Sequence, residues 1–406
     1  MRILIVHNRY QSPGGEDSVV NAEIQLLKDF GHDVSFYERH NSEINSLRFF
    51  QKIQYLREMI WSPKTYRDIK DKIKELKPQI VHFHNIFFLV TPSAYYACRE
   101  EGVPVVQTQH NFRLLCSNAL FYRDHRACED CLKKSLWQGV YHRCYRGSFF
   151  LTTALVKMLR THWKKRTWID LIDAHIVLSQ FSRQKFIQAG IPEEKIFVKP
   201  NFTPSPPVFK RQDHGYALYI GRLSEEKGVK FLLEAWRSVK LPLKIIGDGP
   251  LREEMERTTH NQSIKNVEFL GHCSSEKCQE YMQTAKLLLV PSQCYENFPR
   301  VIAEAFSCGV PVVASRLGSL AEIVEDGKTG ILFEPQDIAS FIQKIDWAMT
   351  HEKELNAMGA NARRIFEERY TAEQNYQQLM KIYQNAILLS KKRIEKKYFA
   401  QGRKFF

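Results

Sequence analysis

The first half of the chain alternates between short apolar runs rich in β-branched residues and longer stretches whose apolar residues recur with helical spacing. Short runs of this kind are typical of strands buried in a parallel sheet. The predicted strands are residues 3–7, 34–37, 80–84 and 105–109. The helices predicted between them are residues 17–30, 66–77 and 92–101. This order predicts βαβ units, and therefore a doubly wound α/β sheet.

The same rhythm restarts after residues 200–207, where four prolines in eight positions are typical of a linker. Further strands are predicted at residues 217–220, 243–246, 267–270, 287–290 and 312–314, and a last helix at 372–389. We therefore predict two Rossmann-like domains that face a central cleft. The predicted boundaries are 1–203, with a cysteine-rich insertion at about 112–146, then 204–370, and a helix with a basic tail over 371–406.

Ligands of such sheets bind at the carboxyl ends of the strands, so the residues that follow each strand are the candidates for chemistry. Gly14 and Gly15 precede the first helix, where backbone amides can approach an anion; a plain turn is the alternative. Arg222 and Lys227 follow the strand at 217–220 and suit a diphosphate. A solvated, charged helix start is the alternative for these two cations.

Two carboxylates and one histidine complete the candidate site. Glu296 is predicted on the loop before a helix, and Glu304 inside that helix among mostly apolar neighbours. Two acids so placed can accept hydroxyl hydrogen bonds from one extended ligand, such as a ribose and a hexose. His110 follows the strand at 105–109 and is predicted either to face the cleft or to be a satisfied core histidine.

These residues lie in segments that resemble family 4 of the retaining glycosyltransferases, which have the GT-B fold. The segments in the second half are 221–228, 246–250, 267–271, the Glu296-x7-Glu304 block, 311–318 and 322–330. In the first half, residues 14–15, 80–84, 110 and 177–182 also match. The resemblance implies transfer of a hexose-type sugar from a nucleotide diphosphate sugar to a glycan or lipid-linked acceptor, in surface polysaccharide or glycolipid synthesis.

The resemblance also assigns roles to single residues. It implies that the catalytic residues are Glu296, His110, Arg222 and Lys227, and that no catalytic metal is required. Arg222 and Lys227 would hold the diphosphate, and His110 would contact the transferred sugar. The implied donor-binding residues are Gly14, Gly15, Arg222, Lys227, Gly271, His272, Glu296, Asn297, Phe298 and Glu304. Among these, Glu304 would bind the ribose, and the backbone at Gly271 and His272 would meet the nucleobase.

Four of the nine cysteines lie close together in the sequence, directly after His110. They are Cys116, Cys128, Cys131 and Cys144, and the central two form a Cys-x2-Cys pair. This core predicts a structural zinc site that is separate from catalysis. Four unrelated reduced thiols are the alternative, since the chain opens without a secretory signal and disulfides are not the expected state.

The net charge of +14 indicates an anionic partner. Residues 391–404 carry seven basic residues and one acid, and residues 148–168 predict a basic amphipathic helix. Both are candidates for contact with an anionic membrane surface, although for the helix we favour the alternative that it packs on a core. We expect a cytoplasmic protein, peripheral on the inner face of the plasma membrane if these contacts form, because no apolar stretch is long enough to span a bilayer.

Three other functions are compatible with some of these sequence features. A basic nucleic-acid-binding or membrane-binding protein would explain the charge, but the sequence contains no nucleic-acid recognition motif, and we expect no nucleic-acid partner. A nicotinamide-dependent oxidoreductase is disfavoured because the first strand is followed by Pro-Gly-Gly at 13–15 and not by Gly-x-Gly-x-x-Gly. A GT-B epimerase or phosphorylase would act without a sugar acceptor.

Overall fold

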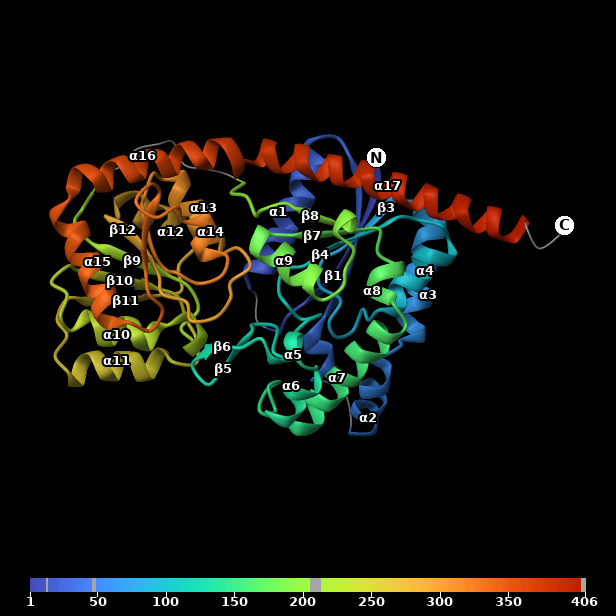
Figure 1. Cartoon of the computed structure of the whole chain (residues 1–406), viewed down its shortest axis with the longest axis horizontal. Helices are drawn as coiled ribbons and strands as arrows, with labels where there is room; N and C mark the ends of the chain where they lie inside the picture. The colour runs from blue at the N-terminus through green and yellow to red at the C-terminus, as the bar shows by residue number, and fades with distance from the viewer. Residues whose placement is uncertain (12–13, 46–48, 205–212, 403–406) are drawn as a thin grey trace.

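The computed structural model describes the backbone of residues 1–11, 14–45, 49–204 and 213–402, and the side chains of the same residues except 49–53 and 394–402. Pro13, residues 205–207 of the predicted linker and most of the basic tail therefore lie outside the described residues or side chains. Within the described part, two separate parallel sheets confirm the prediction of two α/β halves (Figure 1).

The N-terminal half is built on a six-stranded parallel sheet of order β2-β1-β3-β4-β7-β8. Its strands are β1 (Arg2–Arg9), β2 (Asp33–His40), β3 (Ile80–Phe83), β4 (Val105–Thr108), β7 (Ala174–Val177) and β8 (Ile196–Val198). The main helices around it are α1 (Gly15–Asp29), α3 (Pro63–Leu76), α4 (Ser93–Glu100), α7 (Phe149–Lys164) and α9 (Gln180–Gln188). The inner strands β3, β4 and β7 are buried at every position, which explains their nearly continuous apolar runs.

The C-terminal half repeats this plan with a six-stranded parallel sheet of order β11-β10-β9-β12-β13-β14. Its strands are β9 (Ala217–Ile220), β10 (Leu243–Ile246), β11 (Val267–Gly271), β12 (Leu287–Val290), β13 (Val312–Ser315) and β14 (Gly330–Phe333). The helices include α10 (Val229–Trp236), α11 (Arg252–Asn261), α12 (Ser275–Thr284), α13 (Arg300–Ser307), α14 (Leu320–Ile323), α15 (Ile338–Thr350) and α16 (Glu352–Arg369). Three of the five predicted strands of this half have the observed bounds.

The last helix, α17 (Ala372–Gly402), crosses from the C-terminal half back to the N-terminal half along one edge of the molecule (Figure 1). Four of its side chains belong to the core of the N-terminal sheet: Leu379, Ile382, Tyr383 and Ala386. The chain end thus fastens the two halves together, because α17 follows α16 of one half and packs on the sheet of the other.

A cysteine-rich insertion separates β4 from α7. It contains a two-stranded hairpin, β5 (Tyr122–Arg123) and β6 (Arg126–Ala127), and two short helices, α5 (Asp130–Lys133) and α6 (Trp137–Tyr141). Ser148 caps α7, accepting a hydrogen bond from the backbone N–H of Leu151 at 3.3 Å. The short helix α8 (Thr167–Asp170) follows α7.

Most of the apolar face predicted on this helix lies in the protein core, whereas its first residue, Leu151, is 36% exposed. Leu155, Met158 and Leu159 of α7 are fully buried in the N-terminal core cluster. The core-packing alternative is therefore the observed one, and these residues do not form a membrane-facing surface. Among the described residues, no helix is both long enough and apolar enough to cross a bilayer.

Candidate functional site

The loops that follow β9 and β12 pack directly against each other, since these strands are neighbours in the sheet. Gly228 has φ +73°, and a Cβ atom there would lie 1.9 Å from the carbonyl oxygen of Pro291. Only glycine allows this approach without a backbone shift. A hydrogen bond of 2.8 Å from the amide of Gln293 to the carbonyl of Glu226 joins the loops further.

This contact brings together two of the predicted catalytic residues. The ammonium of Lys227 lies 2.6 Å from Oε1 of Glu296, and the hydroxyl of Ser292 donates to the same oxygen at 2.7 Å. Burial alone would lower the pKa of Lys227, but the neighbouring carboxylate raises it above its ordinary value. The side chains of Lys227 and Glu296 remain 31% and 12% exposed, so the pair is accessible from solvent.

Asn297, next to Glu296, connects the candidate site to the other half of the molecule. Its amide Nδ2 donates to the carbonyl of Gln109 at 3.2 Å, and its Oδ1 accepts from the hydroxyl of Ser182. The side chain of Phe298 is buried in the C-terminal core. Glu296 is therefore next to a residue, Asn297, that contacts Gln109, and Gln109 directly precedes His110.

His110 contacts a buried polar cluster in the N-terminal half. Its Nε2 is 2.9 Å from Nδ1 of His84, and the two rings are stacked. Burial lowers the pKa of His110 well below its ordinary range, and that of His84 to about 3. His110 is therefore neutral at physiological pH and can exchange hydrogen bonds with a hydroxyl without carrying charge.

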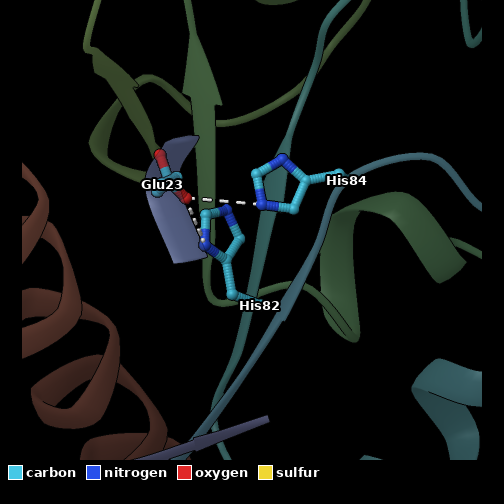
Figure 2. Close-up of side chains that lie close together, drawn as sticks. All are labelled: Glu23, His82 and His84. Carbon is cyan, nitrogen blue, oxygen red and sulfur yellow. Dashed lines mark ion pairs between the residues drawn. The ribbon is translucent and has the colours of Figure 1, made fainter. Parts of the chain in front are cut away.

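Below His84, the carboxylate of Glu23 from α1 faces both His82 and His84 at the end of β3 (Figure 2). These three side chains offer ligand atoms within 4.8 Å of one another, the only such group among the described residues. However, the ammonium of Lys199 lies 2.8 Å from Oε2 of Glu23. Burial would raise the pKa of Glu23, yet Lys199 and His82 hold it well below its ordinary value. A second cation beside Lys199 would be repelled, so we interpret the cluster as a buried ion pair.

Arg222 lines a pocket between the two halves. The pocket measures about 410 Å³ and combines aromatic and aliphatic walls with three guanidinium groups. Arg222 is its only contribution from the C-terminal half. The lining residues are Tyr10, Gln11, Asn41, Ile44, Asn45, Tyr55, Leu56, Met59, Phe88, Arg113, Tyr145, Arg146, Leu151 and Arg222. An amphiphilic, anionic ligand would match this lining.

The remaining predicted donor residues lie on α13 and at the end of β11. Glu304 is in α13, where it pairs with Arg300 at 3.2 Å and where burial raises its pKa. Gly271 ends β11 with φ +69° beside the guanidinium of Arg252, and His272 is exposed. The ends of β9, β11 and β12 all belong to the carboxyl edge of one parallel sheet, as the predicted donor site requires.

Gly14 and Gly15 stand at the start of α1, with no atom of the described residues within 4 Å of a Cβ atom placed on either. Packing against the described residues therefore does not require glycine at these positions. The N–H of Gly14 already donates to the carboxylate of Asp17 at 3.0 Å.

Glu16, in the first turn of α1, is a further candidate that was not among the predicted site residues. The hydroxyl of Tyr10, a pocket residue, donates to its carboxylate at 3.2 Å, and Asn111 donates to Tyr10. Burial raises the pKa of Glu16 to about 8. The position of Glu16 directly after Gly14 and Gly15 was the one sequence feature that could have indicated it.

The four predicted zinc ligands are free thiols, as are all nine cysteines. Hydrogen bonding with Cys116 lowers the pKa of Cys131 to about 6, so these two thiols are in contact. No three sulfurs of the described cysteines lie within 4.8 Å of one another. The structure thus shows one thiol pair, and structural zinc stays a prediction.

The cysteine-rich insertion also contacts the C-terminal half. Glu129, beside Cys128, accepts hydrogen bonds from Lys185 at 2.6 Å and from the hydroxyl of Tyr295 at 2.9 Å. Tyr295 directly precedes Glu296. The insertion therefore contacts the loop that contains the candidate catalytic carboxylate, Glu296.

Comparisons with protein families give matches along most of the chain. The model described as "Glycosyltransferase Family 4" matches residues 13–204, and the model described as "Glycosyl transferases group 1" matches residues 205–365. The boundary between the two matches falls between β8, the last strand of the N-terminal sheet, and β9, the first strand of the C-terminal sheet. The two matches together account for both sheets.

Two curated relatives are similar over part of the chain. A lipopolysaccharide 1,2-N-acetylglucosaminetransferase of Salmonella typhimurium is 27% identical over 238 residues, which are 52% of this chain and 62% of that protein. An uncharacterized glycosyltransferase of Methanocaldococcus jannaschii is 29% identical over 177 residues, 44% of this chain and 50% of that protein. The aligned segments thus span about half the length of the curated relatives.

Two solved structures share the fold over nearly the whole chain. The apo lipopolysaccharide outer core galactosyltransferase WaaB superposes with a TM-score of 0.65 at 19% identity, covering 96% of this chain and 99% of that one. Anabaena HepE in complex with UDP-glucose gives a TM-score of 0.66 at 18% identity, covering 94% and 98%. Both likenesses confirm the predicted GT-B fold.

Proposed function

Because the chain belongs to the family 4 glycosyltransferases with the GT-B fold, we propose that it transfers a hexose-type sugar from a nucleotide diphosphate sugar to a glycan or lipid-linked acceptor, with retention of configuration. The observation that carries this proposal is the contact of Lys227 with Glu296 at the carboxyl edge of the sheet. An ammonium there can bind the diphosphate, while the neighbouring carboxylate accepts hydrogen bonds from the hydroxyls of the donor's sugar.

In the proposed reaction, the bond between the anomeric carbon and the leaving diphosphate oxygen breaks, and a bond from the acceptor hydroxyl to the same carbon forms. The acceptor proton passes to the departing diphosphate on the same face of the sugar. Lys227 and Arg222 stabilise the negative charge that grows on the diphosphate. Glu296 orients the sugar through its hydroxyls, and we propose that no catalytic metal takes part.

Neutral His110 is proposed to hold the transferred sugar from the N-terminal side. Asn297 links the loop of Glu296 to the carbonyl of Gln109, so both contacts to the sugar belong to one connected unit. Glu304 is proposed to bind the ribose, since burial raises its pKa and a hydroxyl can hydrogen-bond to either of its protonation states.

The acceptor is proposed to belong to lipopolysaccharide or O-antigen-type synthesis. The named activity of the Salmonella relative and of WaaB supports this class. The interdomain pocket supports an anionic acceptor, because Arg113, Arg146 and Arg222 line it. The complex of HepE with UDP-glucose supports a nucleotide diphosphate sugar as the donor.

The test compares the wild-type chain with Glu296→Ala in sugar transfer from a panel of nucleotide diphosphate sugars. We expect turnover to fall by about 100-fold or more, because contacts to the reacting sugar act mainly in the transition state, while the thermal unfolding midpoint stays near that of wild type. Glu368→Ala is the matched control, since that exposed carboxylate pairs with Arg364 one turn earlier on α16, a helix that contains no predicted site residue. Equal turnover of Glu296→Ala and wild type would remove Glu296 from the site.

A further inference from the structure

Exposed aromatic side chains gather at one end of the N-terminal half. Nine large apolar side chains are exposed in the part of the chain whose side chains are described, and five of them lie between residues 137 and 151. Tyr141 and Phe150 are the most exposed, at 80% and 78%. The five are Trp137, Tyr141, Phe149, Phe150 and Leu151. Such a concentration is typical of a contact surface and not of scattered surface residues.

The same segment is strongly basic. Residues 131–169 contain nine lysines and arginines and no aspartate or glutamate. Lys133, Lys134 and Arg166 pair with acids outside this stretch, at Glu129, Asp130 and Asp170. The six others are exposed and have no ion pair with a described acid. They are Arg143, Arg146, Lys157, Arg160, Lys164 and Lys165.

Helix α7 presents the aromatic and the basic residues together. Phe150, Lys157 and Lys164 recur every seven residues, so they lie along one face of the helix. The opposite face is buried in the core, which fixes the exposed face outward. The guanidinium of Arg160 lies 5.2 Å from the ring centre of Trp137 and thereby joins α7 to α6. We call these five apolar and six basic residues the aromatic–basic surface.

The aromatic–basic surface adjoins the interdomain pocket. Arg146 and Leu151 belong to the surface and also line the pocket. Tyr145, between Arg143 and Arg146, lines it as well. An amphiphile whose chain lies in a bilayer beneath the surface could therefore place its polar head in the pocket.

We propose that the aromatic–basic surface docks on an anionic lipid bilayer, where the acceptor is presented to the pocket. Basic side chains attract anionic headgroups, and aromatic side chains insert at the boundary between headgroups and acyl chains. The statement about the acceptor rests on the proposed function, whereas the docking itself rests on exposure and charge alone. A duplex nucleic acid would use the cations but gives no role to five exposed apolar side chains.

This surface is distinct from the C-terminal helix. In Figure 1, α17 runs along the upper edge of the molecule, whereas α6 and α7 lie toward the lower edge. Segments so far apart in the plane of the view cannot form one contact face. Docking through the aromatic–basic surface is therefore predicted to persist without the tail.

The experiment is flotation of the full-length chain with vesicles of phosphatidylcholine, with or without phosphatidylglycerol, at low and at high salt. The first variant is Phe149→Ala/Phe150→Ala, which changes no residue of the pocket. The second is Arg143→Gln/Lys164→Gln/Lys165→Gln. Leu388→Ala is the matched control, because Leu388 is also exposed but lies on α17. Circular dichroism and binding of nucleotide diphosphates check that each variant is folded.

We expect wild type to float only with the anionic vesicles and to be released by salt. Loss of the two phenylalanines should weaken binding by about tenfold or more, and loss of three cations by about 100-fold. Leu388→Ala and a chain that ends at residue 393 should bind like wild type. The proposal is overturned if wild type does not float, if the phenylalanine variant floats equally well, if removal of the tail alone abolishes flotation, or if duplex DNA binds more tightly than the vesicles. Nucleotide binding is unaffected by any of these results, so the proposed function is judged separately.

Discussion

Replacing Gly228 by alanine tests whether the close contact between the loops after β9 and β12 holds the catalytic pair in place. The substitution has two separable costs. The left-handed backbone at φ +73° costs a residue with a side chain about 1–2 kcal/mol. The new Cβ would also lie 1.9 Å from the carbonyl oxygen of Pro291, whereas ordinary contact begins at 3.4 Å.

The second cost follows from that overlap. Either loop must move by about 1.5 Å, and such overpacking costs about 1–3 kcal/mol. Gly228→Ala should therefore lower the free energy of unfolding by about 2–5 kcal/mol. Lys227 precedes the glycine, so the same shift should separate it from Glu296. A displacement of about 1 Å at a catalytic group can reduce turnover by about 100-fold.

Gly327→Ala is the matched control. Gly327 has φ +74°, almost the same value, but no atom of the part of the chain that the structure describes lies within 4 Å of a Cβ atom placed there. This variant should show the backbone cost alone, about 1–2 kcal/mol, with turnover near that of wild type. The assay is urea denaturation together with kcat/KM for sugar transfer. Equal stability and equal turnover of the two variants would refute the claim that the loop contact positions Lys227.

Three further predictions address other parts of the structure. Burial raises the pKa of Glu16 to about 8, so its contribution to stability is complete below its ordinary pKa of 4.5 and is lost as pH rises through about 8. The free energy of unfolding of Glu16→Gln, measured in urea, should therefore depend less on pH between these two values than that of wild type. Identical pH profiles for the two proteins would contradict the burial of a protonated carboxyl. Metal analysis of the purified chain should find one zinc per molecule in wild type and none in Cys131→Ser. Wild-type protein without zinc would contradict the predicted zinc site. Chelation with EDTA should leave the initial rate of sugar transfer unchanged, and a rate that falls and returns on addition of Mg²⁺ would contradict the metal-free reaction.

The sequence pattern predicted most of the sheets because their strands are buried on both faces. The strand at 217–220 has the observed bounds, and the apolar run that contains it, residues 216–220, is bordered by Gly215 and Gly221. Strand β7 was not predicted, and one of its four residues is the polar His175. That histidine is buried only because Gln109 and the carbonyl of Trp168 satisfy its ring nitrogens, and no local signal reveals such partners.

The candidate site was predicted by residue type and position, but its connections were not. Lys227 and Glu296 are 69 residues apart, and only the order of strands β9 and β12 makes them neighbours. The bridge from Asn297 to Gln109 depends on how the two halves close. The apolar face of α7 shows the limit most clearly: periodicity identifies such a face, but only tertiary packing decides between core and membrane.

The most direct test of the central claim is calorimetric titration of the chain with the diphosphates of uridine, guanosine, adenosine and thymidine, repeated with Lys227→Ala. The account predicts that at least one nucleotide diphosphate binds wild type, and that removal of the Lys227 ammonium weakens this binding by about tenfold or more. Absence of binding by every nucleotide, or equal affinity of wild type and Lys227→Ala, would contradict the assignment of the diphosphate to this site.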